Sequence, residues 1–275
     1  MLYIIIIFVT HLKNIKGPVM SHKNLNPVNP AKPKRVAIVV SNPSISTTTG
    51  WSVGFWWSEL THPYYKLTEK GHDVEIFSYF GGRCEADAMS DPEDVSQWQA
   101  EDVISRGYKH DPAFVSLLEN TRPAKAIDVA DFDAILIAGG QGPMFSIEKA
   151  PDVIKKFVAF YEAGKIAVAL CHGVAILRYA MLSNGAWLAK GKTVTGFSNI
   201  EEDFADEAVW AMGALPVGKH VMPWRIEDEL RKIGANFIQA GLWRGFAIRD
   251  GNLITGQQNF SGSETTDLLL QAMGE

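Results

Sequence analysis

Residues 165–173 read KIAVALCHG, and this stretch decides the fold. The run from Ile166 to Leu170 is apolar throughout, which is typical of a strand buried on both faces of a parallel sheet. Cys171 follows with no loop between, and a helical pattern of apolar residues runs from Val174 to Leu182. The stretch therefore predicts a strand that turns at once into a helix, with a cysteine at the turn.

Similar apolar runs alternate with helical patterns along the rest of the chain. Further strands are predicted at residues 35–41, 72–79, 133–138, 193–195, 236–239, 245–248 and 252–255. Helices are predicted at 54–71, 150–164, 226–233 and 264–273. This alternation predicts an α/β fold: a doubly wound, largely parallel sheet with helices on both faces. In such sheets ligands bind outside the carboxyl ends of the strands, so residues just after each strand are the site candidates.

The chain has 275 residues, which fits one domain over residues 34–275. Residues 81–128 are rich in polar residues, with weak helical patches at 95–104 and 112–118. We expect them to form an insertion that covers one edge of the sheet.

Residues 1–33 do not fit the α/β pattern. Their apolar run, Leu2 to Val9, is far shorter than the ~20 residues that span a bilayer. It also lacks the basic start and cleavage site of a signal peptide. We expect a disordered extension, or a start-site artefact with translation beginning at Met20. The alternatives are a poor secretory segment and an adhesive tail.

The composition excludes several classes of protein. Apolar residues make up 47% and charged residues 21%, which is typical of a globular protein. The net charge is −5 with no long basic run, so we expect no nucleic-acid partner, and no membrane partner is predicted. Two cysteines cannot form a disulfide framework and suit a reducing cytoplasm. No histidine has metal-ligand spacing and no phosphate-binding loop is present, so neither a metal nor a cofactor is expected.

Cys171 has the surroundings of a nucleophile on a strand-to-helix elbow. Such a turn needs small residues two positions before and after the nucleophile, and Ala169 and Gly173 meet this need. The helix that follows points N–H groups and its positive dipole end at the sulfur, which predicts a lowered thiol pKa and a reactive thiolate. The alternative interpretation is a buried cysteine at the end of a core strand.

Two other segments offer partners for Cys171. The glycine-rich residues 139–142 follow a strand, and an N–H there could form an oxyanion hole with that of His172. An ordinary glycine-rich turn is the alternative. Glu59 lies among aromatic residues at a helix start, where burial would raise its pKa and let it shuttle a proton. The alternative is a solvated glutamate that the helix dipole favours.

A pair of glutamates and a group of tryptophans complete the candidates. One carboxylate of Glu201 and Glu202 could orient His172, although paired glutamates usually form a charged surface turn. Three tryptophans could wall a pocket, and core packing explains them equally well: Trp51, Trp56 and Trp57.

Together these segments resemble the DJ-1/PfpI (ThiJ/PfpI) superfamily from about Arg35 to the C-terminus. The resemblance lies in RVAIVVS, SELTHP around Glu59, IAGGQGPMF, AVALCHG, VTGFSNIEE and GNLITGQQNF. The insertion, and SELTHP after a Trp-rich loop, are most similar to the branch of Hsp31-type chaperones and glutathione-independent glyoxalases (glyoxalase III). The fold that this implies is flavodoxin-like, as in class I glutamine amidotransferases.

The resemblance also implies roles for individual residues. Cys171 matches the nucleophile, His172 its catalytic histidine, and Glu59 the glutamate that hydrogen-bonds the sulfur. Glu202 matches the acidic residue that completes a Cys-His-Glu triad in part of the family. The backbone of Gly140, with that of His172, matches the donors that face the substrate oxygen. Gln141 stands where many relatives carry histidine or asparagine, which leaves the substrate preference open.

The expected function is that of a cofactor-free glyoxalase that converts methylglyoxal to lactate. Two alternatives stay open. One is a stress-response holdase chaperone for unfolded proteins. The other is a cysteine enzyme acting on a different bond: a deglycase of glycated proteins, an amidase-like hydrolase or a peptidase. A glutamine amidotransferase is disfavoured because no His-x-Glu pair follows the cysteine at a distance. The family also implies a homodimer.

Overall fold

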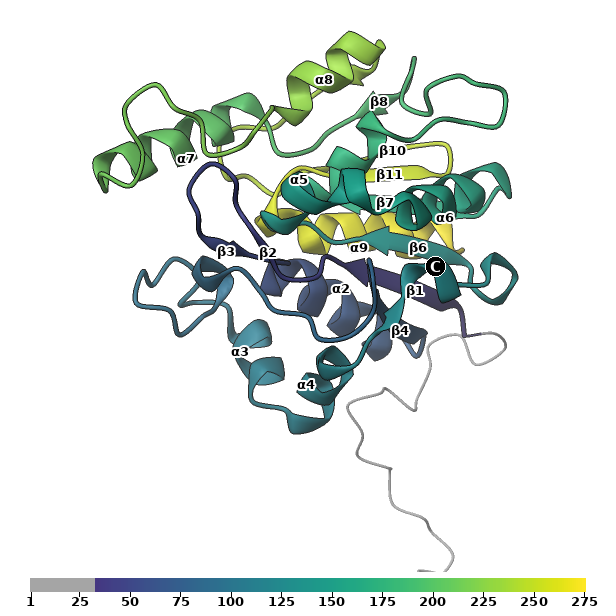
Figure 1. Ribbon diagram of the computed structural model, residues 1–275. Coiled ribbons are helices and arrows are strands. Elements are labelled where there is room, and N and C mark those ends of the chain that lie inside the picture. The colour runs from purple at the N-terminus through teal and green to yellow at the C-terminus, as the bar shows by residue number, and fades with distance from the viewer. Residues whose placement is uncertain (1–32) are drawn as a thin grey trace, which may run out of the picture.

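The computed structural model describes residues 33–275, which are built around one seven-stranded sheet (Figure 1). The strand order is β10-β11-β7-β6-β1-β4-β5, and every neighbouring pair is parallel except β10 and β11. The strands are β1 (Arg35–Val40), β4 (Asp73–Ser78), β5 (Arg122–Pro123), β6 (Ala134–Ile137), β7 (Ile166–Leu170), β10 (Ala247–Asp250) and β11 (Leu253–Gly256). The predicted α/β fold with a largely parallel sheet is confirmed.

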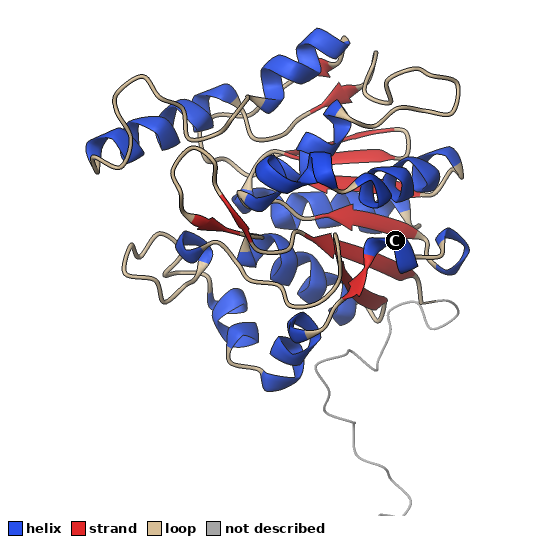
Figure 2. Ribbon diagram, viewed as in Figure 1, coloured by secondary structure: helices blue, strands red, loops and turns tan. Residues whose placement is uncertain are grey.

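Helices cover both faces of this sheet, as Figure 2 shows. The side chains of β1 contact helices on both faces, because successive residues of a strand point to opposite faces. Ala37 and Val39 belong to the core shared with α6 (Pro151–Glu162). Val36, Ile38 and Val40 belong to the core shared with α2 (Trp57–Glu69) and α9 (Gly262–Ala272). Each face is therefore sealed by its own apolar cluster.

The insertion contributes both helices and the edge of the sheet. It contains α3 (Val103–Lys109), α4 (Pro112–Glu119) and β5, which extends the sheet beyond β4. The helix predicted over 95–104 is wrong: α3 begins at Val103, because the Asp102 side chain caps it by accepting a hydrogen bond from Ser105 N at 3.0 Å.

Two helices pack against each other between β8 and β10 in the chain. The predicted α8 (Ile226–Ile233) is present, whereas α7 (Asn199–Ala211) was not predicted from the sequence. Its start carries a capping box in which Ser198 and Glu201 bond each other's backbone N–H. The Ser-x-x-Glu signature was thus present, but it was interpreted as a charged surface turn.

Several short elements complete the chain. The pairs β2 (Ser44–Ile45) with β3 (Ser52–Val53), and β8 (Thr193–Val194) with β9 (Asn236–Phe237), form separate two-stranded sheets. The helix α5 (Gly142–Ser146) follows β6. The remaining single turns of 3-10 helix are η1 (Ala88–Ser90), η2 (Ala124–Ala126), η3 (Val129–Asp131), η4 (Ile147–Lys149) and η6 (Asn259–Ser261).

The expectations for residues 1–33 lie outside the described residues, apart from Pro33. Over residues 33–275 the structure contains no helix with the length and apolar character needed to cross a membrane.

Candidate functional site

Cys171 occupies a strained elbow between β7 and the 3-10 helix η5 (Cys171–Arg178). Its φ is +57°, whereas Leu170 before it is extended. A non-glycine residue in this left-handed region costs roughly 1–2 kcal/mol. Gly173 cannot be larger, because a Cβ there would lie 2.5 Å from Ile137 O. The helix thus begins at the cysteine itself and is shorter than the predicted helix over 174–182.

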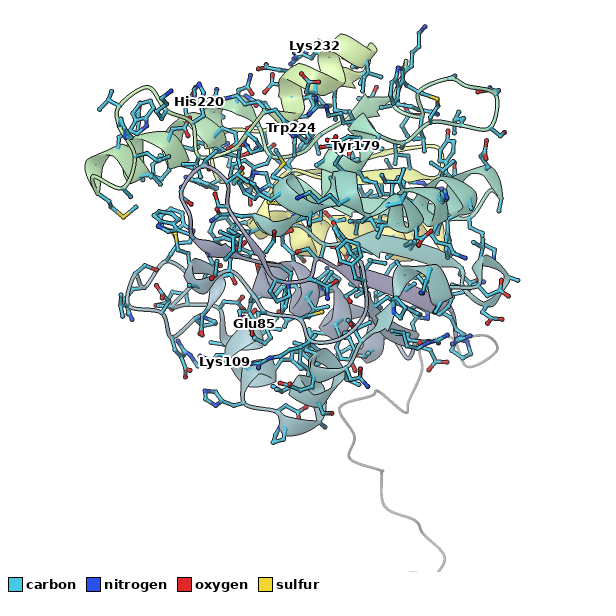
Figure 3. All side chains as sticks on the ribbon, in the orientation of Figure 1. Glu85, Lys109, Tyr179, His220, Trp224 and Lys232 are labelled. Atoms are coloured by element: carbon cyan, nitrogen blue, oxygen red, sulfur yellow. The ribbon has the colours of Figure 1, made fainter. Side chains whose placement is uncertain are left out.

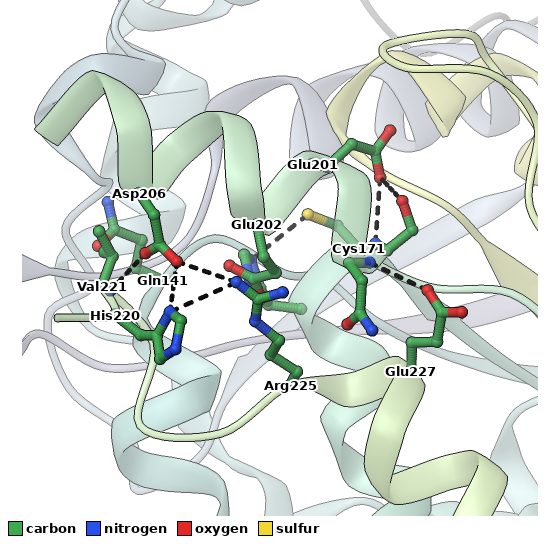
Figure 4. A network of polar contacts seen from close by, with 12 residues as sticks. Gln141, Cys171, Glu201, Glu202, Asp206, His220, Val221, Arg225 and Glu227 are labelled. Carbon is green, nitrogen blue, oxygen red and sulfur yellow. Dashed lines mark hydrogen bonds and ion pairs between the residues drawn. The ribbon is translucent and has the colours of Figure 1, made fainter. Parts of the chain in front are cut away.

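His172 links the cysteine to a buried carboxylate on α7. Its Nδ1 lies 3.7 Å from Cys171 Sγ, and its Nε2 lies 3.1 Å from Glu202 Oε1 (Figure 4). The imidazole also stacks on Phe197, with ring centroids 4.1 Å apart. Because a carboxylate can only accept, Nε2 carries the proton and Nδ1 is left to accept one from the thiol. The structure therefore brings three of the predicted residues into one line.

Glu201, next to Glu202 in the chain, has different hydrogen-bond partners. Glu201 accepts hydrogen bonds from Gln257 Nε2 at 2.8 Å and from Ser198 N at 3.1 Å. It closes the capping box of α7 and holds that helix to the segment after β11. The two adjacent carboxylates therefore divide into Glu201, which fixes the helix, and Glu202, which faces His172.

Glu59 lies on α2, is fully buried and interacts with the Cys171 thiol. Its Oε2 accepts the Gly139 N–H at 2.7 Å, and Oε1 has no hydrogen bond of ordinary geometry. Burial raises the pKa of this carboxyl to about 8, although interactions with the Cys171 thiol and the Gly139 N–H act in the lowering direction. Burial thus accounts for the raised pKa that the sequence predicts for Glu59.

The expected low thiol pKa is wrong. Burial raises the pKa of Cys171 well above its usual value, and the Glu59 carboxyl beside it adds to the rise. The His172 backbone N–H acts in the lowering direction, as predicted for a helix start, but it is the smaller effect. The resting sulfur is therefore a thiol whose proton must move before it can attack.

A further buried carboxyl group, that of Asp87, was not foreseen. Its Oδ1 accepts Gly54 N at 2.9 Å and its Oδ2 accepts Gln141 N at 2.5 Å. Burial raises its pKa to about 7. Asp87 comes from the insertion and ties the loop before α2 to the loop after β6. No local pattern marks it, because both of its partners are distant in the chain.

The cysteine and histidine open into a cavity of about 290 Å³. Its wall is mostly apolar and is formed by Trp51, Trp56, Met89, Trp98, Gln141, Cys171, His172, Phe197, Glu202, Phe204, Ala205, Ala208, Val209, Met212, Val221, Met222, Trp243 and Asn259. Met89 and Trp98 show that the insertion shapes the site as well as the sheet edge. Across residues 33–275, no three His, Cys, Asp or Glu side chains are grouped as a metal site would need.

Two of the predicted binding residues do not line this cavity. Of the three tryptophans expected to wall a pocket, Trp51 and Trp56 line the cavity, whereas Trp57, the first residue of α2, packs against the Phe55 ring with centroids 5.5 Å apart. Gly140 has φ +92°, and a Cβ there would lie 2.5 Å from the backbone of Phe55. Its role as a donor to the substrate stays a prediction. Gln141 does line the cavity.

The segment between α7 and α8 closes one side of the cavity, and Asp206 holds it in place. The buried Asp206 accepts the Val221 N–H at 2.7 Å and lies 2.6 Å from His220 Nδ1 (Figure 4). His220 itself lies at the surface of this segment, where Figure 3 labels it. Arg225 adds a contact at 3.0 Å. These bonds set Val221, with its neighbour Met222, against the cavity.

Comparisons with known proteins identify the family of the chain. The DJ-1/PfpI family model matches residues 53–271. Glyoxalase 3 of Candida albicans is 27% identical over 81% of this chain and 91% of its own length. Glutathione-independent glyoxalase HSP31 of Saccharomyces cerevisiae is 25% identical over 88% and 98%.

Solved structures show the same fold. The Rapid Encystment Protein of Francisella tularensis superposes with a TM-score of 0.76 at 28% identity, covering 88% of this chain and all of that one. The resemblance inferred from AVALCHG and the other motifs, including its Hsp31-like branch, is thereby confirmed. The chain belongs to the DJ-1/PfpI family.

Proposed function

We propose that this protein is a cofactor-free glyoxalase that converts 2-oxoaldehydes such as methylglyoxal to 2-hydroxy acids. The observation that carries the proposal is the buried Glu59 carboxyl, whose pKa is raised to about 8, in contact with the Cys171 thiol. A carboxyl group of this pKa can both take and return a proton near neutral pH. The names of the similar glyoxalases support the same activity.

The first step adds the thiol to the aldehyde. His172 Nδ1, free to accept because Glu202 holds the proton on Nε2, receives the Cys171 proton as the sulfur attacks. The S–C bond forms, the carbonyl electron pair moves to oxygen, and that oxygen takes the proton to give a hemithioacetal. The buried thiol is thus activated only when an electrophile is present.

The second step moves hydrogen between the two former carbonyl carbons. The Glu59 carboxylate interacts with the sulfur, so it lies beside the carbon that the sulfur has attacked. It removes that carbon's proton to form an enediol and returns it to the neighbouring carbon, which gives a thioester. Water then cleaves the S–C bond, which regenerates the Cys171 thiol and releases the 2-hydroxy acid. The aldehyde carbon is oxidised as the ketone carbon is reduced, so no external oxidant is needed.

The test is to incubate the purified protein with methylglyoxal, without glutathione, and to measure D- and L-lactate. We expect lactate of predominantly one configuration, because a fixed carboxylate returns the proton to one face. Absence of lactate from well-folded protein would remove the proposal and leave the chaperone and the other cysteine hydrolases.

Glu202→Gln tests the orienting carboxylate. A glutamine can donate to Nε2 as well as accept, so the proton is no longer held there and Nδ1 is less available as a base. We expect kcat to fall by about 10²-fold or more, within the usual range for general base catalysis, with KM little changed. Glu201→Gln is the matched control, because its carboxylate faces Gln257 rather than His172. Equal losses in kcat for the two variants would indicate damage to α7 instead.

The proposal also covers the cellular compartment and the oligomeric state of the protein. Cys84 and Cys171 are both free thiols, and a reducing cytoplasm keeps a nucleophilic cysteine in that form. We place the protein there, as a homodimer, acting on small aldehydes. Size-exclusion chromatography with light scattering would test the oligomeric state.

A further inference from the structure

The cavity extends much farther along α7 than a three-carbon substrate requires. Glu202 on α7 and Met212, the residue that caps the end of α7, both line it and stand ten positions apart. At 1.5 Å per residue these positions are about 15 Å apart. Methylglyoxal spans only about 3 Å between its end carbons. Once such a molecule is bound to Cys171, most of the cavity stays unfilled.

The wall beyond the catalytic residues is a continuous aromatic surface. It begins with Phe197, which stacks on His172, and passes to Trp243 at 5.9 Å between ring centroids. Trp243 in turn contacts Trp98 at 5.6 Å and Phe204 at 5.4 Å. Aromatic rings of this kind bind flat apolar groups through edge and face contacts.

Two alanines of α7 leave room beside this surface. Ala205 and Ala208 lie on the lining face of the helix, where larger side chains would project into the cavity. No lysine or arginine belongs to the wall among the described residues, so a phosphorylated or carboxylated substituent would find no cation there. The space therefore favours an uncharged apolar group.

The reactive end of the cavity has polar atoms that a dicarbonyl could bond. Gln141 Oε1, Asn259 Nδ2 and the indole nitrogen of Trp56 are all buried without a hydrogen-bond partner. All three residues line the cavity together with Cys171. The Nδ2 and indole N–H groups can donate to carbonyl oxygens, which orients the dicarbonyl toward the sulfur and the substituent toward the aromatic surface.

We propose that the preferred substrates are 2-oxoaldehydes with a bulky apolar substituent, aryl or branched alkyl, on the ketone carbon. This inference rests on the proposed glyoxalase activity. For each substrate R–CO–CHO, one water is consumed and R–CHOH–COOH is released. The S–C bond to Cys171 forms and breaks within the cycle, so the change of substituent leaves the chemistry balanced as before.

The experiment compares phenylglyoxal with methylglyoxal through kcat/KM, measured as the mandelate and lactate formed. Product is followed because arginine side chains also consume phenylglyoxal. We expect wild type to favour phenylglyoxal by about tenfold or more, as apolar pockets discriminate between substituents on this scale. Turnover of methylglyoxal but not of phenylglyoxal would overturn this inference and leave the glyoxalase proposal standing. Turnover of neither would overturn both.

Ala205→Phe fills the space beside the aromatic surface and gives a test that is independent of intrinsic reactivity. We expect the ratio of the two kcat/KM values, phenylglyoxal over methylglyoxal, to fall at least tenfold. Ala211→Phe on the same helix is the control, because Ala211 is exposed and does not line the cavity. Ala208→Phe repeats the test should Ala205→Phe fold poorly. An unchanged ratio in a folded cavity variant would overturn the inference.

Discussion

Replacing Cys171 with alanine is expected to abolish lactate formation from methylglyoxal, with a loss in kcat/KM on the order of 10⁴-fold or more. The reason is that the proposed mechanism passes through a covalent bond to this sulfur, and no other group can take its place. Among the described residues the other cysteine is Cys84, which is buried beside Thr121 and lies outside the cavity wall. The measurement is stereospecific lactate assay of purified wild type and variant.

Cys84→Ala is the matched control for this experiment. It makes the same cysteine-to-alanine change at another buried site, so any general effect of thiol loss on folding appears in both variants. We expect it to keep nearly full activity. If Cys171→Ala kept more than a tenth of the wild-type rate while folded, covalent catalysis at the elbow would be wrong.

Glu59→Gln is expected to lower kcat by about 10²- to 10⁴-fold, which is the usual contribution of a positioned acid–base group. Glutamine keeps the size and can still accept the Gly139 N–H, but it cannot carry a proton between the substrate carbons. The pH profile should change as well. Proton abstraction needs the carboxylate, so wild-type kcat/KM should rise as the pH approaches about 8, the pKa of Glu59. A variant with an unchanged rate would exclude Glu59 from the mechanism.

The same substitution should alter the pH dependence of stability. Between pH 4.5 and about 8 the folded protein keeps a proton on Glu59 that the unfolded chain has released. The folded state therefore binds more protons, and its stability falls as the pH rises through this window. Glu59→Gln removes this term, so its stability relative to wild type should grow by an amount on the order of a few kcal/mol and level off above pH 8. Denaturant melts at several pH values would measure it.

Asp87 enters that comparison only through its charge, which is the smallest of the causes named for the pKa of Glu59. Its pKa is raised to about 7, so it also makes stability fall with rising pH, but it is present in wild type and variant alike. The thiol of Cys171 titrates above the window, because its pKa lies well above the usual value. The difference between the two proteins therefore reports chiefly on Glu59.

The sequence predicted the parts of the molecule that depend on local patterns. The apolar run before Cys171 and the small residues at Ala169 and Gly173 define the elbow within a few positions. The sequence did not distinguish Trp56 from Trp57, because which of them lines the cavity depends on where α2 begins, and adjacent residues at a helix start point in different directions.

Features that depend on distant contacts were beyond prediction. The thiol pKa is set by burial and by Glu59, a residue far away in sequence. Asp87 acquires its place only when the insertion folds against the loops at Gly54 and Gln141. A helix dipole argument for Cys171 was sound in direction, but no local pattern reveals that desolvation outweighs it.

The far wall of the cavity and its reactive end are formed by different segments of the chain. The sulfur lies at the end of β7 and Glu59 near the start of α2, whereas the far wall comes from the insertion and from the part of α7 beyond Glu202. Natural selection could therefore exchange one part without retuning the other. Related proteins with the same AVALCHG elbow would keep one chemistry while differing in substrate preference. That preference should follow residues 89–98 and 204–212 rather than the elbow.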